Sequence, residues 1–191
     1  MNGSPPTSAP FVELRGLYKS FGQNAVLRGL DLSIESGGIF TMLGGSGSGK
    51  SVSLKHIIGL LHPDRGRVLV EGRDVTDLRE PDWVEVRKEF GYVFQGSALF
   101  DSLSVFENVA YALREHRSWP EERIAERVAE CLDAVGLAGI ESTMPAELSG
   151  GMRKRVGVAR AIALEPKAIL YDEPSTGLDP ANSRRIGELI Q

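Results

Sequence analysis

Residues 44 to 51 bring together the residue types that hold a chain of phosphates. They read Gly-Gly-Ser-Gly-Ser-Gly-Lys-Ser and satisfy the pattern G-x-x-x-x-G-K-S/T at every fixed position. In such a loop the glycines let backbone N–H groups turn toward the β-phosphate, and the following helix directs the positive end of its dipole at the same anion. The residues expected to bind nucleotide are Gly44, Gly45, Ser46, Gly47, Ser48, Gly49, Lys50 and Ser51.

Two side chains of this loop carry further chemistry. The Lys50 ammonium can reach the β- and γ-phosphates, and the Ser51 hydroxyl can ligate Mg²⁺. The loop therefore predicts ATP and Mg²⁺ as ligands. A flexible Gly/Ser turn before a helix is the structural alternative, and the Lys-Ser pair at the required place argues against it.

Two adjacent carboxylates, Asp172 and Glu173, end the apolar run 168–171. A strand that ends in this way delivers them to the mouth of a parallel sheet, where such folds bind ligands. We expect Asp172 to hold Mg²⁺ through its water shell and Glu173 to orient or deprotonate the attacking water. A strand that ends in Asp-Glu favours a structural role when it stands alone, and the phosphate loop upstream favours catalysis.

Residues 148 to 152, Leu-Ser-Gly-Gly-Met, predict a second anion site at the start of a helix. Ser149 can serve simply as the helix N-cap. Gly150 and Gly151 are unfavourable in a first turn but permit a phosphate to approach exposed N–H groups. The cations at 153–155 oppose the helix dipole, so either solvent or a nearby anion must offset them.

The elements that must position these residues follow from hydrophobic periodicity. Alternation predicts half-buried strands at 11–14, 30–34 and 67–71, which suggest a small antiparallel sheet, and the apolar run 39–43 predicts a strand entering the phosphate loop. Helical stripes follow the loop at 54–61 and recur between about 103 and 136, where Pro120 separates two helices. A third helix is expected over about 150–164. The charges that we expect on a solvated face are Glu122, Arg123, Glu126 and Arg127.

Composition limits the class of protein. The net charge is −4, which disfavours a nucleic-acid partner bound by broad phosphate neutralisation. Cys131 is the single cysteine and is expected to be a buried apolar residue. No run of about 18 apolar residues occurs, so no membrane span is expected. Residues 1–10 have the composition of a flexible tail.

Taken together, these motifs resemble the nucleotide-binding subunit of an ABC transporter, from about Phe11 to Gln191. The resemblance includes residues 175–179, Ser-Thr-Gly-Leu-Asp, which are similar to the family's D-loop. It implies an α/β P-loop NTPase core with a parallel sheet, an antiparallel β subdomain and an inserted helical subdomain over about 96–148. It also implies roles for Gln95, which would touch Mg²⁺ and sense the transmembrane partner, for Phe21, which would stack on adenine, and for Asp179 at the nucleotide.

The same resemblance implies a mechanism. Two such domains would sandwich two ATP molecules, each held by the phosphate loop of one copy and by Ser149 to Gly151 of the other. Closure would pull on transmembrane permease subunits, and hydrolysis with release would reopen the pair. The domain would therefore be peripheral, at the cytoplasmic face of the bacterial inner membrane.

Finer cues lie in 94–116 and 151–155. Together with residues 161–166, these segments resemble the Mla type of ABC protein, which moves phospholipids between bacterial membranes beside a substrate-binding protein with an Mce domain. An importer or exporter of another small solute is the alternative within transport. A soluble ABC protein of DNA repair or translation is disfavoured, since only about a hundred residues separate Ser51 from Leu148, too few for the usual inserted coiled coil.

One family feature has no counterpart in the sequence. The family carries a switch histidine about thirty residues beyond the catalytic glutamate, whereas the histidines here are His56, His62 and His116. We therefore expect the C-terminal part of the core to be missing, and expect the 191-residue chain to bind nucleotide yet hydrolyse it poorly. A non-hydrolysing regulatory module is the alternative of another class, which Glu173 disfavours.

Overall fold

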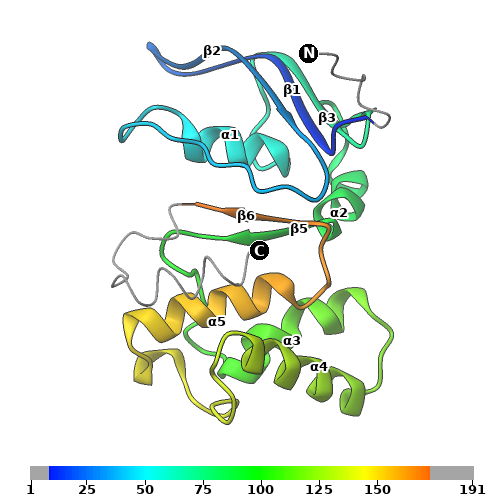
Figure 1. Cartoon of the computed structure of the whole chain (residues 1–191), viewed down its shortest axis with the longest axis vertical. Helices are drawn as coiled ribbons and strands as arrows, with labels where there is room; N and C mark the ends of the chain where they lie inside the picture. Colours follow the sequence, from blue (N-terminus) through cyan, green and yellow to red (C-terminus); the bar gives the residue numbers. More distant parts are fainter. Residues whose placement is uncertain (1–8, 173–191) are drawn as a thin grey trace, which may run out of the picture. The chain divides into compact units, whose positions relative to one another are not determined.

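The structure is a computed structural model that describes residues 9–172. The chain divides into two compact units, residues 1–87 and 88–191, and each is described separately. The elements in chain order are β1 (Val12–Phe21), β2 (Asn24–Ile34), α1 (Lys50–Ile57), β3 (Arg65–Val70), β4 (Arg73–Asp74), α2 (Glu80–Lys88), β5 (Phe90–Val93), α3 (Val105–His116), α4 (Glu121–Ala134), the short 3₁₀ helix η1 (Pro145–Glu147), α5 (Gly150–Ile162) and β6 (Ala168–Tyr171) (Figure 1).

The first unit is built on an antiparallel sheet in the order β2-β1-β3-β4, which confirms the expected antiparallel part. Strand β1 pairs with both neighbours, so that Val12 faces Ile34 on one side and Val70 on the other. Strands β1 and β2 are longer than the alternation of apolar residues predicts. Their register shifts between Leu14 and Leu17, so the alternation does not continue along the whole strand. Such an irregularity moves the buried positions out of phase, and a period-2 pattern then appears to stop.

The prediction of a strand over 39–43 is wrong within the first unit. The described residues of that unit pair β1 to β4 with one another and place no strand beside this run. Most of its side chains are exposed, 61% for Ile39 and 90% for Leu43. Apolar character predicts burial, but a strand also needs a neighbour to accept its hydrogen bonds, and the sequence of the run does not encode that neighbour.

Helix α2 was not expected from the sequence. It buries Trp83 and Val86, and Arg87 donates from Nε to the Ile58 carbonyl, 2.9 Å away, just beyond the end of α1. At that point the chain approaches closely: a Cβ added to Gly59 would lie 2.3 Å from the Trp83 ring. The end of α1 is therefore fixed by a buried aromatic side chain that periodicity alone did not reveal.

The second unit contains a parallel pair of strands, β5 and β6, with Phe90 facing Ala168 and Val93 facing Tyr171. Helix α5 packs between this pair and helices α3 and α4 (Figure 1). The two expected stripes are buried as predicted, and they meet in one apolar cluster together with Cys131 and Val156. The stripe residues are Val105, Val109 and Leu113 on α3 and Ile124, Val128 and Leu132 on α4.

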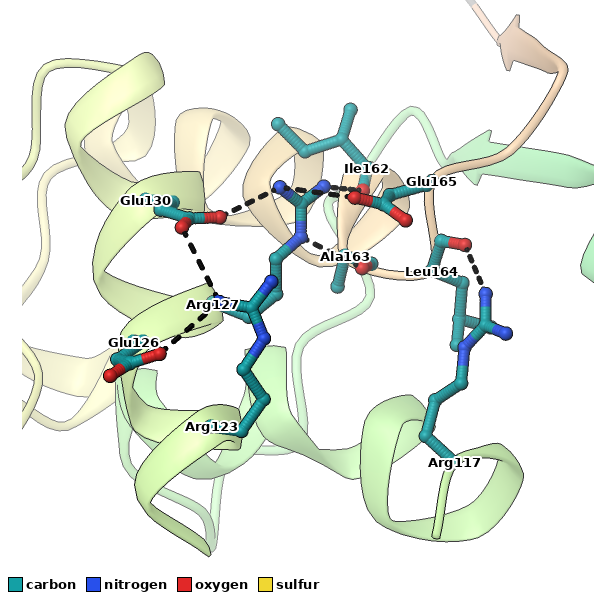
Figure 2. Close-up of polar contacts among 9 residues, drawn as sticks. All are labelled: Arg117, Arg123, Glu126, Arg127, Glu130, Ile162, Ala163, Leu164 and Glu165. Atoms are coloured by element: carbon teal, nitrogen blue, oxygen red, sulfur yellow. Dashed lines mark hydrogen bonds and ion pairs between the residues drawn. The ribbon is translucent and has the colours of Figure 1, made fainter. Parts of the chain in front are cut away.

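The C-terminal end of α5 receives hydrogen bonds from one arginine of α4 and from another that directly follows α3. Arg127 of α4 donates from Nε to the Ala163 carbonyl at 3.1 Å and from Nη2 to the Ile162 carbonyl at 2.9 Å (Figure 2). Arg117, which follows α3, donates to the Leu164 carbonyl at 3.0 Å. The last carbonyls of a helix lack intrahelical hydrogen-bond donors and carry partial negative charge. The arginines supply both the missing donors and an opposite charge.

The expectation of a merely solvated charged face on α4 is therefore wrong for Arg127. This side chain is mostly buried, and it also pairs with Glu130 at 3.0 Å and Glu165 at 3.8 Å. Its neighbours Arg123 and Glu126 form an exposed pair at 3.1 Å, in line with the expectation. Arg123 and Arg127 carry the same charge and lie on the same helix. Their roles differ because the C-terminal end of α5 lies beside Arg127.

A glycine on β5 sets the distance between the parallel strands and α5. A Cβ added to Gly91 would lie 2.5 Å from the carbonyl oxygen of Ala161, a backbone atom that has little freedom to move. We expect Gly91→Ala to destabilise the protein by about 2 kcal/mol and to lower its Tm by about 4–8 °C, measured by thermal unfolding. Gly96→Ala is the matched control, because nothing lies within 4 Å of its Cβ position. Equal Tm values for the two variants would contradict this packing.

Candidate functional site

The phosphate loop of the first unit lies before α1, and most of it is exposed. The Lys50 ammonium folds back over the loop, donating to the carbonyl of Gly44 at 2.7 Å and to that of Gly45 at 3.0 Å. The loop backbone bends on itself, because Ser48 N–H donates to the same Gly45 carbonyl at 3.3 Å. The predicted lysine thus spans the loop and holds its charge over the backbone.

Two glycines of this loop lie in tight surroundings, and one of them also has a backbone conformation that favours glycine. A Cβ added to Gly44 would lie 2.6 Å from the Ser48 hydroxyl oxygen. Gly49 has φ of +94°, in the left-handed region, and a Cβ there would lie 2.8 Å from the Leu27 side chain. Such a tight turn leads directly into α1, and the positive end of a helix dipole favours an anion, so the residues present fit a phosphate chain.

In the second unit, Gln95 and Asp172 come to the same edge of the parallel pair. Strands β5 and β6 end in register at Val93 and Tyr171, and the Asp172 N–H donates to the Val93 carbonyl at 3.0 Å. The polypeptide leaves β5 and β6 at the same edge. The structure therefore brings the Gln95 amide and the Asp172 carboxylate, one of the two predicted carboxylates, to this edge. Amide and carboxylate oxygen atoms are of the kind that Mg²⁺ prefers.

Asp172 is held by a residue that sequence reasoning missed. It is 9% exposed, and the Tyr92 hydroxyl donates to its Oδ2 at 3.2 Å. Burial and the adjacent carboxylate raise the pKa of Tyr92 above its usual value, which already lies well above neutral pH, and the protonated phenol is the donor. The only signal in the sequence was the position of Tyr92 on the strand before Gln95.

Gln95 occupies the corner of a tight turn. The Ser97 N–H donates to the Phe94 carbonyl at 3.0 Å, which closes the turn around Gln95 and Gly96. Gln95 itself is exposed. Its predicted contacts with Mg²⁺ and with a transmembrane partner need an accessible side chain, and the turn provides one.

The N-terminal end of α5 is exposed at Ser149 and Gly150. The Ser149 hydroxyl accepts a hydrogen bond from the Met152 N–H at 3.2 Å, which confirms its N-cap role. Nothing lies within 4 Å of a Cβ position at Gly150, so the backbone there is open to approach. An anion site formed by Ser149, Gly150 and Gly151 stays a prediction.

The remaining site residues are placed less fully. Phe21 ends β1 and is 47% exposed, with the Lys19 ammonium 5.8 Å from the centre of its ring. Its stacking on adenine stays a prediction. Glu173 and Asp179, and with them residues 175–179, lie outside the described residues. The proposed division into a 1–10 tail and an 11–191 domain also stays a prediction.

The comparisons with known proteins agree with this geometry. A family profile described as "ABC transporter" matches residues 27–176, which include the phosphate loop, the α5 N-terminus and the Asp172 strand end. The chain belongs to the ABC transporter family. Its fold is accordingly that of an ABC ATPase cassette, in which β5 and β6 belong to the parallel part and β1 to β4 form the antiparallel part.

Among its relatives, this ABC cassette is 46% identical over 179 residues to the "Probable ribonucleotide transport ATP-binding protein mkl" of Mycobacterium leprae, covering 94% of this chain and 52% of that protein. It is 43% identical to the "Intermembrane phospholipid transport system ATP-binding protein MlaF" of Haemophilus influenzae, covering 94% and 68%. The chain spans about half the length of the mycobacterial relatives that it matches.

Among solved structures, the ABC cassette matches the "Dimeric structure of a post-hydrolysis state of the ATP-binding cassette MJ0796 bound to ADP and Pi". The TM-score is 0.87 at 32% identity, covering 93% of this chain and 80% of that one. Within residues 9–172 no helix has both the length and the apolar character needed to cross a bilayer.

Proposed function

We propose that this chain binds and hydrolyses ATP as the nucleotide-binding subunit of a transporter that moves phospholipids between bacterial membranes. The observation that carries the first half is the phosphate loop, in which Gly49, with its left-handed backbone, leads into α1 and Lys50 spans the loop. The identity to MlaF over 94% of the chain supports the second half.

The residues divide the work between them. Lys50 and the N–H groups of the loop bind the β- and γ-phosphates, and Phe21 stacks on the base. Bound Mg²⁺ would neutralise charge on the phosphates and would be held by Ser51, Gln95 and Asp172. Glu173, directly after Asp172, orients and deprotonates the attacking water.

The exposed N-terminus of α5 supports a shared site. We infer that two copies associate head to tail, so that Ser149, Gly150 and Gly151 of one copy complete the ATP bound at the loop of the other, with Asp179 nearby. The dimeric cassette with ADP and phosphate supports the same association. Transmembrane permease subunits would then hold the dimer at the cytoplasmic face of the inner membrane, beside an Mce-domain substrate-binding protein.

A transporter for another solute is the second candidate, favoured by the likeness to the mycobacterial protein named for ribonucleotide transport. Affinity capture of the tagged protein from detergent-solubilised membranes, followed by mass spectrometry, separates the two. Phospholipid transport predicts a permease together with an Mce-domain protein. Recovery of a permease with a solute-binding protein that lacks an Mce domain would contradict it.

A second measurement tests the alternative that the chain is a non-hydrolysing nucleotide-binding module. We expect Glu173→Gln to bind ATP as the unsubstituted protein does and to hydrolyse it at least about 100-fold more slowly, because a positioned general base contributes a factor of this order. Release of phosphate, measured with the purified protein and its captured permease, reports this. Equal phosphate release by the two proteins would contradict a catalytic Glu173.

A further inference from the structure

The backbone just after Gln95 adopts an unusual conformation. Ser97 and Ala98 both have positive φ, +65° and +47°, although neither is glycine. Consecutive left-handed residues of this kind are rare in L-peptides and persist only where their surroundings hold them. The turn that carries Gln95 therefore needs an external restraint.

Arg160 of α5 supplies that restraint. Its Nη1 donates to the Ala98 carbonyl and its Nη2 to the Ser97 carbonyl, both at 2.8 Å. The rigid guanidinium fork thus fixes the direction of two successive peptide groups. Phe100 covers the cation, with the ring centre 5.9 Å from the guanidinium carbon, and burial lowers the pKa of Arg160 without bringing its charge into question near neutral pH.

The backbone of α5 lies against the same turn. A Cβ added to Gly157 would be 3.5 Å from the Cα, Cβ and carbonyl oxygen of Ser97. Ser149 caps the N-terminal end of α5, and this end is expected to meet the partner copy's nucleotide. Arg160 lies on the same helix. A helix transmits displacement along its axis because its hydrogen-bonded turns resist stretching.

We propose that Arg160 is a positioning residue that sets the Gln95 turn and connects it mechanically to the N-terminal end of α5. This inference rests on the proposed function of Gln95 at Mg²⁺ and the transmembrane partner. It adds a physical connection, since a displacement of α5 on nucleotide binding moves the guanidinium fork and with it the two peptide groups that follow Gln95.

The structural test is amide hydrogen exchange of the turn. In Arg160→Met, the Ser97 amide, which closes the turn, is expected to exchange at least tenfold faster than in the unsubstituted protein. Arg155→Met is the matched control: Arg155 is also on α5 and also donates to two carbonyls, those of Val135 and Gly136, but these follow α4. Unchanged exchange of Ser97 in Arg160→Met, or an equal increase in both variants, would overturn the proposal.

The functional test separates positioning from general stability. With the captured permease, Arg160→Met is expected to lower the kcat for ATP at least tenfold with little change in KM, and Arg160→Lys to restore only part of it. In a Gln95→Ala background, adding Arg160→Met should lower kcat no further, since both changes remove the same contribution. Additive losses would overturn the proposal. A Gln95→Ala protein that hydrolyses ATP normally would contradict the role of Gln95 instead, and the exchange result would distinguish the two failures.

Discussion

Replacing Lys50 by methionine is expected to weaken ATP binding about 100-fold, or by about 2.7 kcal/mol, the loss of one to two hydrogen bonds to charged groups. The ammonium already lies over the loop, 2.7 Å from the Gly44 carbonyl, so little reorganisation is needed for it to meet a phosphate. Methionine keeps the length and apolar stem of the side chain and removes the charge together with the ammonium's hydrogen-bond donors. Isothermal titration with the non-hydrolysable analogue of ATP measures the change.

Lys55→Met is the matched control for that measurement. Lys55 lies in the last turn of the same helix. Its replacement removes an equal charge beyond the loop. We expect this variant's affinity for the nucleotide to stay within about twofold of the unsubstituted value, since the half-buried Lys55 is not part of the phosphate loop. Similar losses in the two variants would show that net charge, rather than the Lys50 position, accounts for binding.

Asn108→Asp is expected to be the most destabilising single-atom change in the second unit. Asn108 is fully buried, at 0% exposure, and its Nδ2 donates to three carbonyls, those of Phe100, Leu103 and Ser104, at 3.1, 3.0 and 3.0 Å. An aspartate of the same shape would place an oxygen against these three acceptors. We expect a loss of about 3–5 kcal/mol, typical of an uncompensated buried charge, measured by urea unfolding.

The control for this change is Asn24→Asp, at an exposed position where β2 begins. The same chemical change at the surface should alter stability by no more than about 0.5 kcal/mol. Because Asn108 anchors residues 100–104, the loop that continues from the Gln95 turn, Asn108→Asp should also raise hydrogen exchange in this segment. An unfolding free energy equal to that of Asn24→Asp would show that the network around Asn108 contributes little.

Local patterns were sufficient where one short segment carries all of the required information. The phosphate loop is a run of eight residues whose glycines, lysine and helix start act on one another, so its sequence predicted its structure. The α3 and α4 stripes were predicted for the same reason, because burial of one helix face follows from a period of 3.6 residues. Ser149 was identified as an N-cap because the bond to Met152 spans three residues.

Contacts between distant segments required the tertiary structure. The run 39–43 was given a strand because its composition is apolar, yet pairing depends on a neighbour elsewhere in the chain. Arg127 and Arg123 have the same type and lie on the same helix, and the carbonyls at the end of α5 separate their roles. Tyr92 reaches Asp172 across 80 residues, and Arg160 reaches Ser97 across 63.

The sequence by itself therefore determined which chemistry this protein carries: a phosphate-binding loop, a strand that ends in carboxylates and a capped helix with glycines in its first turn. Only the tertiary structure decided how the second unit holds its part of that chemistry, with Tyr92 on Asp172 and Arg160 on the turn of Gln95. The physical reason is range. Backbone conformation and capping depend on residues within a few positions, whereas a hydrogen bond between strand and helix depends on how the whole chain packs.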